Sequence, residues 1–179
     1  MEELELIKRL KNKETQNYAF HLLIKKYQEQ VYWMIRKMVV THEDANDLTQ
    51  DVFIKVHQKI NTFNENSQLF TWIYRIATNE CLSFLRKQKR RAFFSLESYH
   101  DHLAEKLKES HVVTEDEVSY KLQQALLILP DKQRLVFQMK YFDDLKYEEL
   151  SKILDTSIGS LKASYHHAVK KIEKYLTDH

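Results

Sequence analysis

Apolar residues recur every three to four positions along most of the chain, the spacing that is typical of amphipathic α-helices. In the N-terminal half this pattern predicts three helices, over residues 17–40, 44–60 and 70–90. In the C-terminal half it predicts four, over residues 118–129, 132–141, 147–154 and 160–176. The polar residues 61–69 are rich in Asn and Ser and are expected to form a loop.

The break between the first two C-terminal helices has a local cause. The residue before a proline avoids the helical region, so Leu129-Pro130 ends one helix. Asp131 is then placed to cap the next helix. Apolar residues have no regular spacing over residues 92–117, apart from a possible short helix near residues 102–108.

Composition narrows the fold class. The 179 residues include one Gly and one Pro, which excludes most β-sandwiches, barrels and doubly wound α/β folds because their turns need glycine. A Walker loop and a dinucleotide fingerprint are excluded for the same reason. We therefore expect an all-α protein made of two small helical domains joined by a flexible linker.

The charge distribution suggests where the domains begin and end. Residues 1–91 carry 16 basic and 11 acidic side chains, residues 92–117 carry 2 and 7, and residues 118–179 carry 10 and 8. Two basic blocks therefore flank an acidic stretch, which we interpret as two domains, 1–91 and 118–179, separated by a linker. The sequence leaves open whether the two domains pack together.

Several classes of site are not expected. The charged N-terminus has no signal-peptide core, no apolar run is long enough to span a membrane, and the single cysteine, Cys81, cannot form an internal disulfide. These features indicate a cytoplasmic protein that is not integral to the membrane. The adjacent histidines do not share a helix face, so we expect no metal, and neither a cofactor nor a catalytic residue is predicted.

The last two predicted helices resemble a helix-turn-helix, because a connection of three to five residues with the chain's glycine joins them. At 100° per residue, Ser160, Ser164, His167 and Lys171 lie on a different face from the apolar residues of the final helix. Small polar side chains there could approach base edges while lysines contact phosphates, and Ser157 could cap the helix. A helical hairpin with a solvated polar face remains an equal alternative.

The helix over residues 70–90 combines a polar face with an aromatic loop. Arg75, Asn79 and Arg86 lie within about 40° of one another, opposite an apolar face. Aromatic rings, amides and arginines together suit unstacked single-stranded bases. The alternative is that Trp72 and Phe70 belong to the core and that the basic end of the helix complements its dipole.

The helix over residues 44–60 carries Asp44, Asp47 and Asp51 on one side, with Gln50 close by. This face is a candidate for docking a protein partner. The alternative, that acids near a helix N-terminus only oppose the dipole, covers Asp44 and Asp47 well and Asp51 poorly.

Taken together, these motifs resemble a known family. DANDLTQDVFIKVHQKI and TFNENSQLFTWIYRIATNECLSFLRKQKRR, with the upstream FHLLIKKYQEQVYWMIRKMV, resemble region 2 of the extracytoplasmic-function sigma factors of bacterial RNA polymerase. LILPDKQRLVFQMKYFDDLKYEELSKILDTSIGSLKASYHHAVKKIEKYL resembles their region 4. The resemblance covers about residues 17–176 in the family's order and spacing.

The resemblance implies a role for each motif. The N-terminal domain would bind the β′ clamp helices of core RNA polymerase and would recognise and melt the −10 element of promoter DNA. The C-terminal domain would read the −35 element, and the β flap is its expected polymerase contact. Core polymerase would be bound through Asp47, Gln50, Asp51 and Phe53. The −10 element would be bound through Phe63, Asn64, Ser67, Phe70, Trp72, Arg75, Asn79, Arg86, Lys89, Arg90 and Arg91. The −35 element would be bound through Ser157, Ser160, Lys162, Ser164, His167, Lys170 and Lys171.

Two departures from the family pattern change these expectations. The family often has Arg where this chain has Ser164 and His167, so −35 readout would depend more on lysines, backbone amides and DNA shape. Asp155 replaces the usual glycine near the corner, and Asp tolerates a left-handed backbone better than most residues. The family also implies an anti-sigma factor as a partner and an envelope or environmental signal. The alternatives kept open are a stand-alone helix-turn-helix regulator and a helical adaptor that binds only protein.

Overall fold

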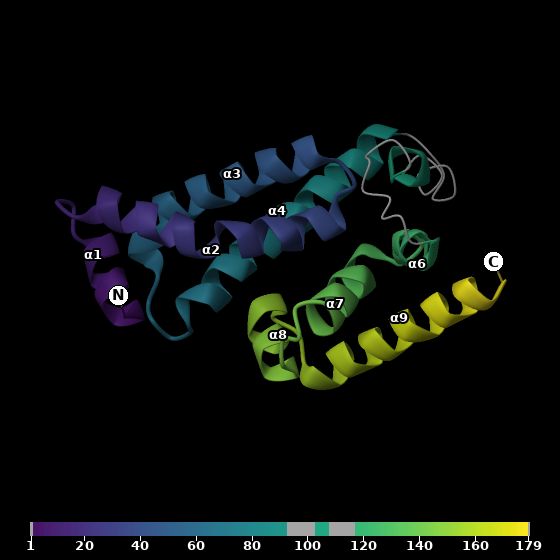
Figure 1. The fold of residues 1–179 in the computed structure, drawn as a ribbon. Coiled ribbons are helices and arrows are strands. Elements are labelled where there is room, and N and C mark those ends of the chain that lie inside the picture. Colours follow the sequence, from purple (N-terminus) through teal and green to yellow (C-terminus); the bar gives the residue numbers. More distant parts are fainter. Residues whose placement is uncertain (1, 93–102, 108–116, 179) are drawn as a thin grey trace.

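The computed structural model describes residues 2–92, 103–107 and 117–178, and within these ranges every regular secondary-structure element is a helix. The helices form two groups, α1 to α4 from the N-terminal half and α6 to α9 from the C-terminal half (Figure 1). The all-α fold class expected from the sequence is confirmed. Within the described ranges, every helix is too short or too polar to cross a membrane.

The N-terminal group is built on three long helices, α2 (Gln16–Met38), α3 (His42–Lys59) and α4 (Leu69–Ala92). Each buries an apolar stripe, which on α3 consists of Ala45, Leu48, Val52, Phe53 and Val56. The side-chain oxygen of Thr41 accepts a hydrogen bond from the backbone N–H of Asp44 at 3.1 Å and so caps α3. A short 3-10 helix, η1 (Ile60–Thr62), leads from α3 into the loop before α4.

An additional helix, α1 (Glu3–Lys11), precedes this group and was not expected from the sequence. Its side chains Leu6, Ile7 and Leu10 are buried in the same core as α2 to α4. Four apolar residues in one short charged segment give too little periodicity for a prediction, yet the three that are buried suffice when an apolar surface is available to receive them.

The C-terminal group contains α6 (Glu117–Leu127), α7 (Asp131–Tyr141), α8 (Tyr147–Leu154) and α9 (Ile158–Asp178). The ring of Phe137 on α7 stacks on those of Tyr141 and Tyr165, with centroids 5.2 and 5.6 Å apart. This stack joins α7 to the long final helix.

One capping prediction was wrong. Asp131 is the first residue of α7, and Pro130 occupies the cap position. The Asp131 carboxylate instead pairs with Lys89 of α4 at 2.8 Å and lies 3.7 Å from the guanidinium of Arg134.

A short helix near residues 102–108 was expected, and residues 103–107 are helical. Leu107 packs there with Leu127 of α6.

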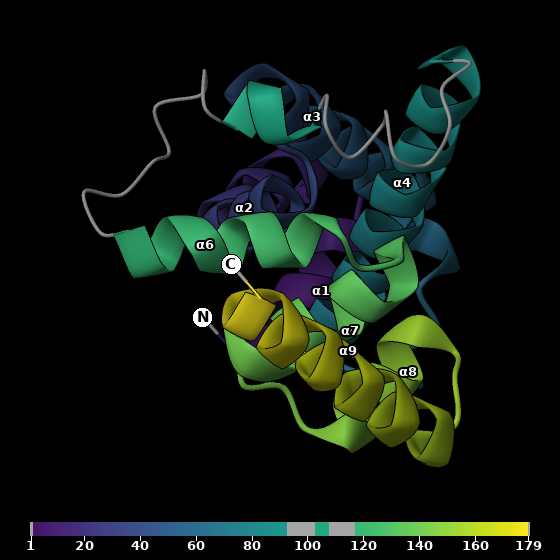
Figure 2. The ribbon, with the colours of Figure 1, turned by 90° about the vertical axis from the view of Figure 1, so that its right-hand side faces the viewer.

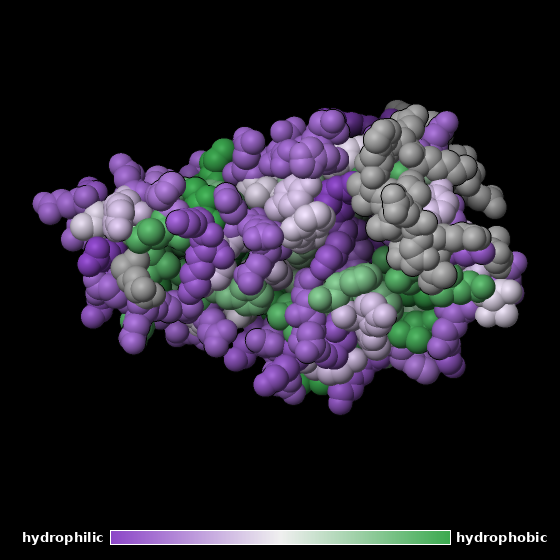
Figure 3. All heavy atoms as spheres, in the orientation of Figure 1, coloured by the Kyte–Doolittle hydropathy of each residue, from purple (hydrophilic) through white to green (hydrophobic). Residues whose placement is uncertain are grey.

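The two groups share one hydrophobic core, which answers the question of packing that the sequence left open. Leu135, Val136 and Met139 of α7 are buried in the same cluster as the apolar residues of α2, α3 and α4. Figure 2 shows α6 lying beneath α2 and α3, with α7 to α9 below it. Figure 3 shows a largely hydrophilic face in which hydrophobic residues gather along the junction between the two groups.

Truncating Leu10 should test whether α1 is an integral part of the fold. Leu10 is fully buried, so Leu10→Ala should lower the free energy of unfolding by about 2–5 kcal/mol through lost burial and the cavity left behind. Urea denaturation measures the change. Leu4→Ala on the same helix is the matched control, because Leu4 is 63% exposed and should cost little. Equal effects of the two substitutions would contradict the placement of α1.

Candidate nucleic-acid interface

One exposed polar face runs along α4. Arg75, Asn79 and Arg86 are all exposed, on the side of the helix opposite its buried residues Ala77 and Cys81. The separation of faces predicted from helical geometry is therefore present. The last turn of α4 adds three cations, of which Arg90 and Arg91 are exposed and Lys89 is half-buried.

In the loop between η1 and α4, the aromatic side chain is buried and the polar side chains remain at the surface. Phe63 is 2% exposed and packs against the half-buried Trp72, with ring centroids 5.3 Å apart. Phe63 is thus a core residue in this structure and is not placed to stack on a base. Asn64 is exposed and Ser67 is half-buried, so these polar groups remain at the surface.

Phe70 and Trp72, for which the sequence left core and surface open, are both half-buried. The Phe70 ring lies 4.1 Å from that of Tyr74 and 6.4 Å from that of Tyr27. Phe70 therefore packs between α4 and α2, whereas Trp72 packs against Phe63 of the loop, and both keep part of their surface accessible.

The acidic face of α3 is also exposed, with one correction among its candidates. Asp47, Gln50 and Asp51 are exposed, whereas Phe53 is 6% exposed and belongs to the core. The neighbouring Ile54 is 53% exposed. Sequence reasoning missed Ile54, although an apolar residue outside the buried stripe of an otherwise regular helix is a usable signal.

Ile54 lies in a shallow hollow of the outer surface. The hollow has a volume of about 400 Å³ and is formed by α2 and α3. Its lining residues are Phe20, Ile24, Gln50, Phe53, Ile54, His57 and Gln58. An apolar hollow beside the acidic side chains of the same helix gives this face both shape and charge for a protein partner.

In the C-terminal group, α8 and α9 form the expected helix-turn-helix corner. Asp155 has φ 49° and ψ 51°, the left-handed conformation that glycine usually supplies. The hydroxyl of Ser157 accepts a hydrogen bond from the backbone N–H of Ser160 at 3.3 Å, so Ser157 caps α9. Helix α9 begins two residues earlier than predicted, at Ile158.

The polar face of α9 lies as the helical wheel predicted. Leu161, Ala168 and Ile172 are buried. Ser164 is half-buried. The exposed candidates are Ser157, Ser160, Lys162, His167, Lys170 and Lys171.

The two predicted DNA-binding faces meet across one cleft. The cleft has a volume of about 760 Å³, and its lining includes Asn79, Arg86 and Lys89 of α4 as well as Lys132 and Lys171 of the C-terminal group. A second cavity of about 240 Å³ places Ser160 and Ser164 beside Leu82 of α4. The candidates from two separate sequence motifs are thus brought together by the packing of the two groups.

Some of these candidates are already engaged across the junction. The guanidinium of Arg75 donates from Nε to the backbone carbonyl of Lys152 at the end of α8, at 3.2 Å, and from Nη2 to the same oxygen. Lys89 pairs with Asp131. In this arrangement a backbone carbonyl and a carboxylate bind two cations that nucleic acid would otherwise contact.

Cys81 lies on the buried side of α4 and is fully buried, as expected for a small core residue. Burial raises the pKa of its thiol to about 12. The thiol therefore stays protonated near neutral pH and is a poor nucleophile. Burial also raises the pKa of Tyr74, whose hydroxyl donates to the backbone carbonyl of Gln30 at 3.2 Å.

The chain matches two family models. The model described as Sigma-70 region 2 matches residues 23–91, and the model described as Sigma-70, region 4 matches residues 119–172. The chain is 31% identical to the ECF RNA polymerase sigma factor SigW of Bacillus subtilis, over 98% of this chain and 99% of that protein. It is 28% identical to the ECF RNA polymerase sigma-E factor of Escherichia coli K12, over 87% and 85%.

Solved structures share the fold. The sigma factor RpoE in complex with the anti-sigma factor NepR from Bartonella quintana superposes with a TM-score of 0.67 at 20% identity, covering 88% of this chain and 96% of that one. CnrH in complex with the cytosolic domain of CnrY gives a TM-score of 0.70 at 16% identity, covering 98% and 97%.

The corner residue Asp155 offers a direct test of the helix-turn-helix geometry. Asp155→Gly should change the free energy of unfolding by less than about 1 kcal/mol, because glycine adopts the left-handed backbone freely. Asp155→Val should lower it by about 1–2 kcal/mol through steric strain. Urea denaturation of both variants measures the difference. Equal stability of the two variants would mean that the corner is not left-handed.

Proposed function

This chain is an extracytoplasmic-function sigma factor of the sigma-70 family, a subunit that directs RNA polymerase to promoters, and from that premise we propose how its parts divide the work. Residues 1–91 bind core polymerase and recognise and melt the −10 element, residues 118–179 read the −35 element, and residues 92–117 tether the two. The protein itself performs no covalent chemistry. The exposed polar face of α4, next to an amide-bearing loop, is the observation that carries this proposal.

The −10 surface is assigned to α4 and its loop. On α4, Arg75 offers a fork of donors and Asn79 offers an amide. Together these groups suit an unstacked base. Trp72 and Phe70 support the loop. Further along α4 the cations follow the DNA backbone as phosphate contacts. These cations are Arg86, Lys89, Arg90 and Arg91.

Core polymerase is assigned to the outer face of α3. Asp47, Gln50 and Asp51 present acidic and amide groups to the β′ clamp helices, and Ile54 adds an apolar contact in the adjoining hollow. Phe53 supports this face from the core. The face lies on the outside of the molecule, so polymerase can approach it while the two groups are still packed together.

The −35 surface is assigned to α9, with the β flap of polymerase as the further partner of this domain. Ser157 and Ser160 lie at the helix N-terminus, where first-turn N–H groups and small hydroxyls suit a phosphate. Ser164 and His167 are the candidates for base edges. The backbone contacts are assigned to Lys162, Lys170 and Lys171. With serine and histidine at the reading positions, DNA shape contributes a large share of specificity.

Reading both elements requires the two groups to separate. The −35 and −10 elements lie about two helical turns apart, roughly 70 Å of duplex. In the packed arrangement Asn79, Arg86 and Lys89 of α4 line the same cleft as Lys171 of α9, so one promoter cannot engage both surfaces at the spacing of its two elements. A partner that favours the packed arrangement would hold the protein inactive. An anti-sigma factor that responds to an envelope or environmental signal would act in this way, and relatives of this fold bind such factors.

Transcription in vitro tests the proposal. The purified chain is mixed with core RNA polymerase and fragmented genomic DNA from its host, and transcript starts are mapped. Discrete starts that share two upstream elements at fixed spacing are the expected result. The absence both of such starts and of a stable complex with core polymerase would overturn the proposal.

Arg75→Ala and Asn79→Ala should each reduce transcription from the mapped promoters by roughly tenfold or more, in line with the loss of a base-specific contact. Core polymerase binding should be unchanged, since neither residue lies on the outer face of α3. Lys174→Ala, which removes an exposed cation of α9 outside the assigned contacts, is the control. Wild-type transcription by both α4 variants would remove α4 from the −10 surface.

Weakening the junction should make the free chain a better DNA binder. Lys37 pairs with Asp143 at 2.5 Å and Lys89 with Asp131, so Asp131→Asn/Asp143→Asn removes two ion pairs that hold the groups together and also takes a negative charge from beside the buried Arg134. The affinity of the free chain for promoter duplex should rise roughly two- to tenfold, because each half-exposed pair contributes little. Fluorescence anisotropy measures it.

The control for this variant removes the same charge without touching the junction. Asp144 and Glu148 are exposed, and Asp144 pairs within its own group with Lys140. Asp144→Asn/Glu148→Gln should therefore leave affinity near the wild-type value. An equal rise in both double variants would assign the effect to net charge instead of to opening.

A further inference from the structure

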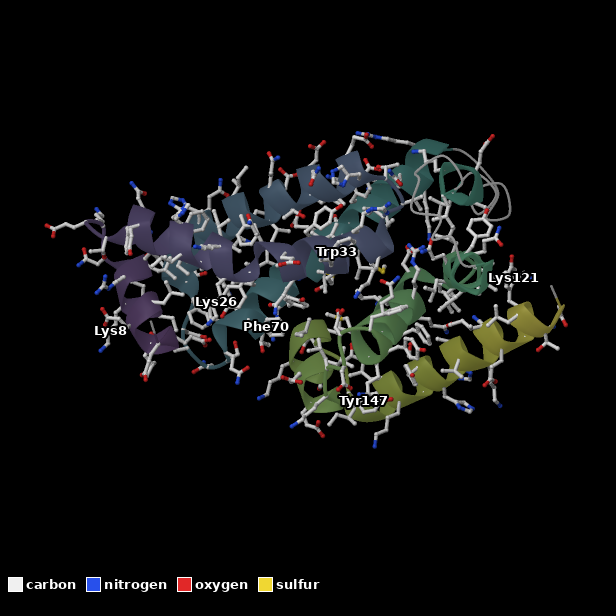
Figure 4. The ribbon with its side chains drawn as sticks, in the orientation of Figure 1. Lys8, Lys26, Trp33, Phe70, Lys121 and Tyr147 are labelled. Carbon is white, nitrogen blue, oxygen red and sulfur yellow. The ribbon has the colours of Figure 1, made fainter. Side chains whose placement is uncertain are left out.

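Helix α1 lies beside the loop that precedes α4, and it precedes the segment that the region 2 family model matches, which begins at residue 23. Its apolar side chains fix it to the core of the N-terminal group. Figure 4 shows Lys8 projecting from α1 on the side away from α4. Two other side chains of α1, Glu3 near its start and Lys11 at its end, reach the loop and the start of α4.

Glu3 acts on the end of the loop. Its carboxylate Oε1 accepts a hydrogen bond at 3.0 Å from the backbone N–H of Leu69, the first residue of α4. The first turn of α4 has no acidic residue of its own. The free N–H groups of a helix start favour a negative charge, and here a distant segment supplies it. Glu3 also accepts a weaker hydrogen bond from the hydroxyl of Tyr27 at 3.4 Å.

Lys11 acts on the middle of the loop. Its Nζ pairs with the carboxylate of Glu65 at 2.8 Å and lies 5.9 Å from the centroid of the Phe63 ring. Glu65 has φ 62°, a left-handed backbone that costs energy in any residue with a side chain. The ion pair and the buried Phe63 ring therefore hold this loop in a conformation that it would not keep by itself.

From these contacts we propose that α1 is a positioning element for the −10 reading loop, with Glu3 and Lys11 as its positioning residues. The inference rests on the proposed −10 role of the loop. Neither residue contacts DNA in this assignment. Glu3 fixes where α4 starts and Lys11 fixes the left-handed turn, so that Asn64 stays exposed and Ser67 partly exposed in the loop.

Charge exchange tests Lys11. Lys11→Glu, Glu65→Lys and the double variant are assembled with core polymerase, and each is titrated with a fluorescein-labelled single strand that carries the −10 element of a mapped promoter. Lys11→Glu should weaken binding roughly two- to fivefold, the range for one exposed ion pair. Restoring opposite charges in the double variant should recover most of the loss. Lys8→Glu is the control, because it removes the same charge from an exposed position of α1.

Two measurements test Glu3: hydrogen exchange, which needs no DNA, and the affinity for the −10 strand. In Glu3→Ala the amide of Leu69 should exchange faster than in the wild type, because its acceptor is gone, and −10 strand affinity of the holoenzyme should fall roughly two- to tenfold, as for a lost helix cap. Glu5→Ala is the matched control, since Glu5 pairs with Arg9 inside α1. It should change neither quantity.

The outcomes separate the two proposals. Unchanged exchange at Leu69 in Glu3→Ala, or no recovery in the charge-exchange double variant, would overturn the positioning role of the residue concerned. Faster exchange with full strand affinity would also overturn it, because the loop would then read DNA without α1. If the wild-type holoenzyme binds no −10 strand, the proposed function of the loop fails, while the exchange result still decides whether Glu3 holds the start of α4.

Discussion

The arrangement of the two helical groups depends on one buried cation. The guanidinium of Arg134, 1% exposed on α7, donates from Nη2 to the backbone carbonyl of Met38 at 2.9 Å. Met38 is the last residue of α2, so this carbonyl is one of those that a helix end leaves without an internal partner. Gln138, one turn further along α7, donates to the carbonyl of Lys37 at 2.6 Å. Helix α7 therefore caps α2 from the other half of the chain.

This constraint explains why the junction can be both specific and reversible. A buried charge costs free energy unless it is paired, and Arg134 meets that need with a helix-end carbonyl, whose partial negative charge suits a cation, and with Asp131. When the groups separate, water can satisfy the same carbonyl and the same guanidinium. The partners that Arg75 and Lys89 find across the junction are likewise a carbonyl and a carboxylate, oxygen acceptors that the phosphates and base edges of DNA can replace. The hydrogen-bond donors of Arg75 and Lys89 therefore serve both the packing of the two groups and the binding of promoter DNA.

Much of the fold followed from periodicity, and the exceptions have identifiable causes. The long helices bury regular stripes, which is why their positions and the exposed face of α4 could be predicted. Helix α1 was not predicted because its three buried apolar residues gain stability only against a surface that the sequence does not display. The family resemblance placed Phe53 and Phe63 among the contact residues, whereas both lie in the core, and it passed over the exposed Ile54. From the sequence, Arg134 is expected at an ordinary surface position of an amphipathic helix. Its role at the junction could be recognised only from the three-dimensional arrangement.

The central claim is that the two promoter-reading surfaces face one cleft in the free chain and part in the transcription complex. The most direct measurement is the distance between spin labels on Glu29→Cys of α2 and Glu173→Cys of α9, both exposed positions outside the assigned contacts. Cys81 stays unlabelled because it is buried. One narrow distance distribution in the free chain that shifts to a much longer distance with core polymerase and promoter DNA is the expected result. The same distance in both states, or a long and broad distribution in the free chain, would contradict the account.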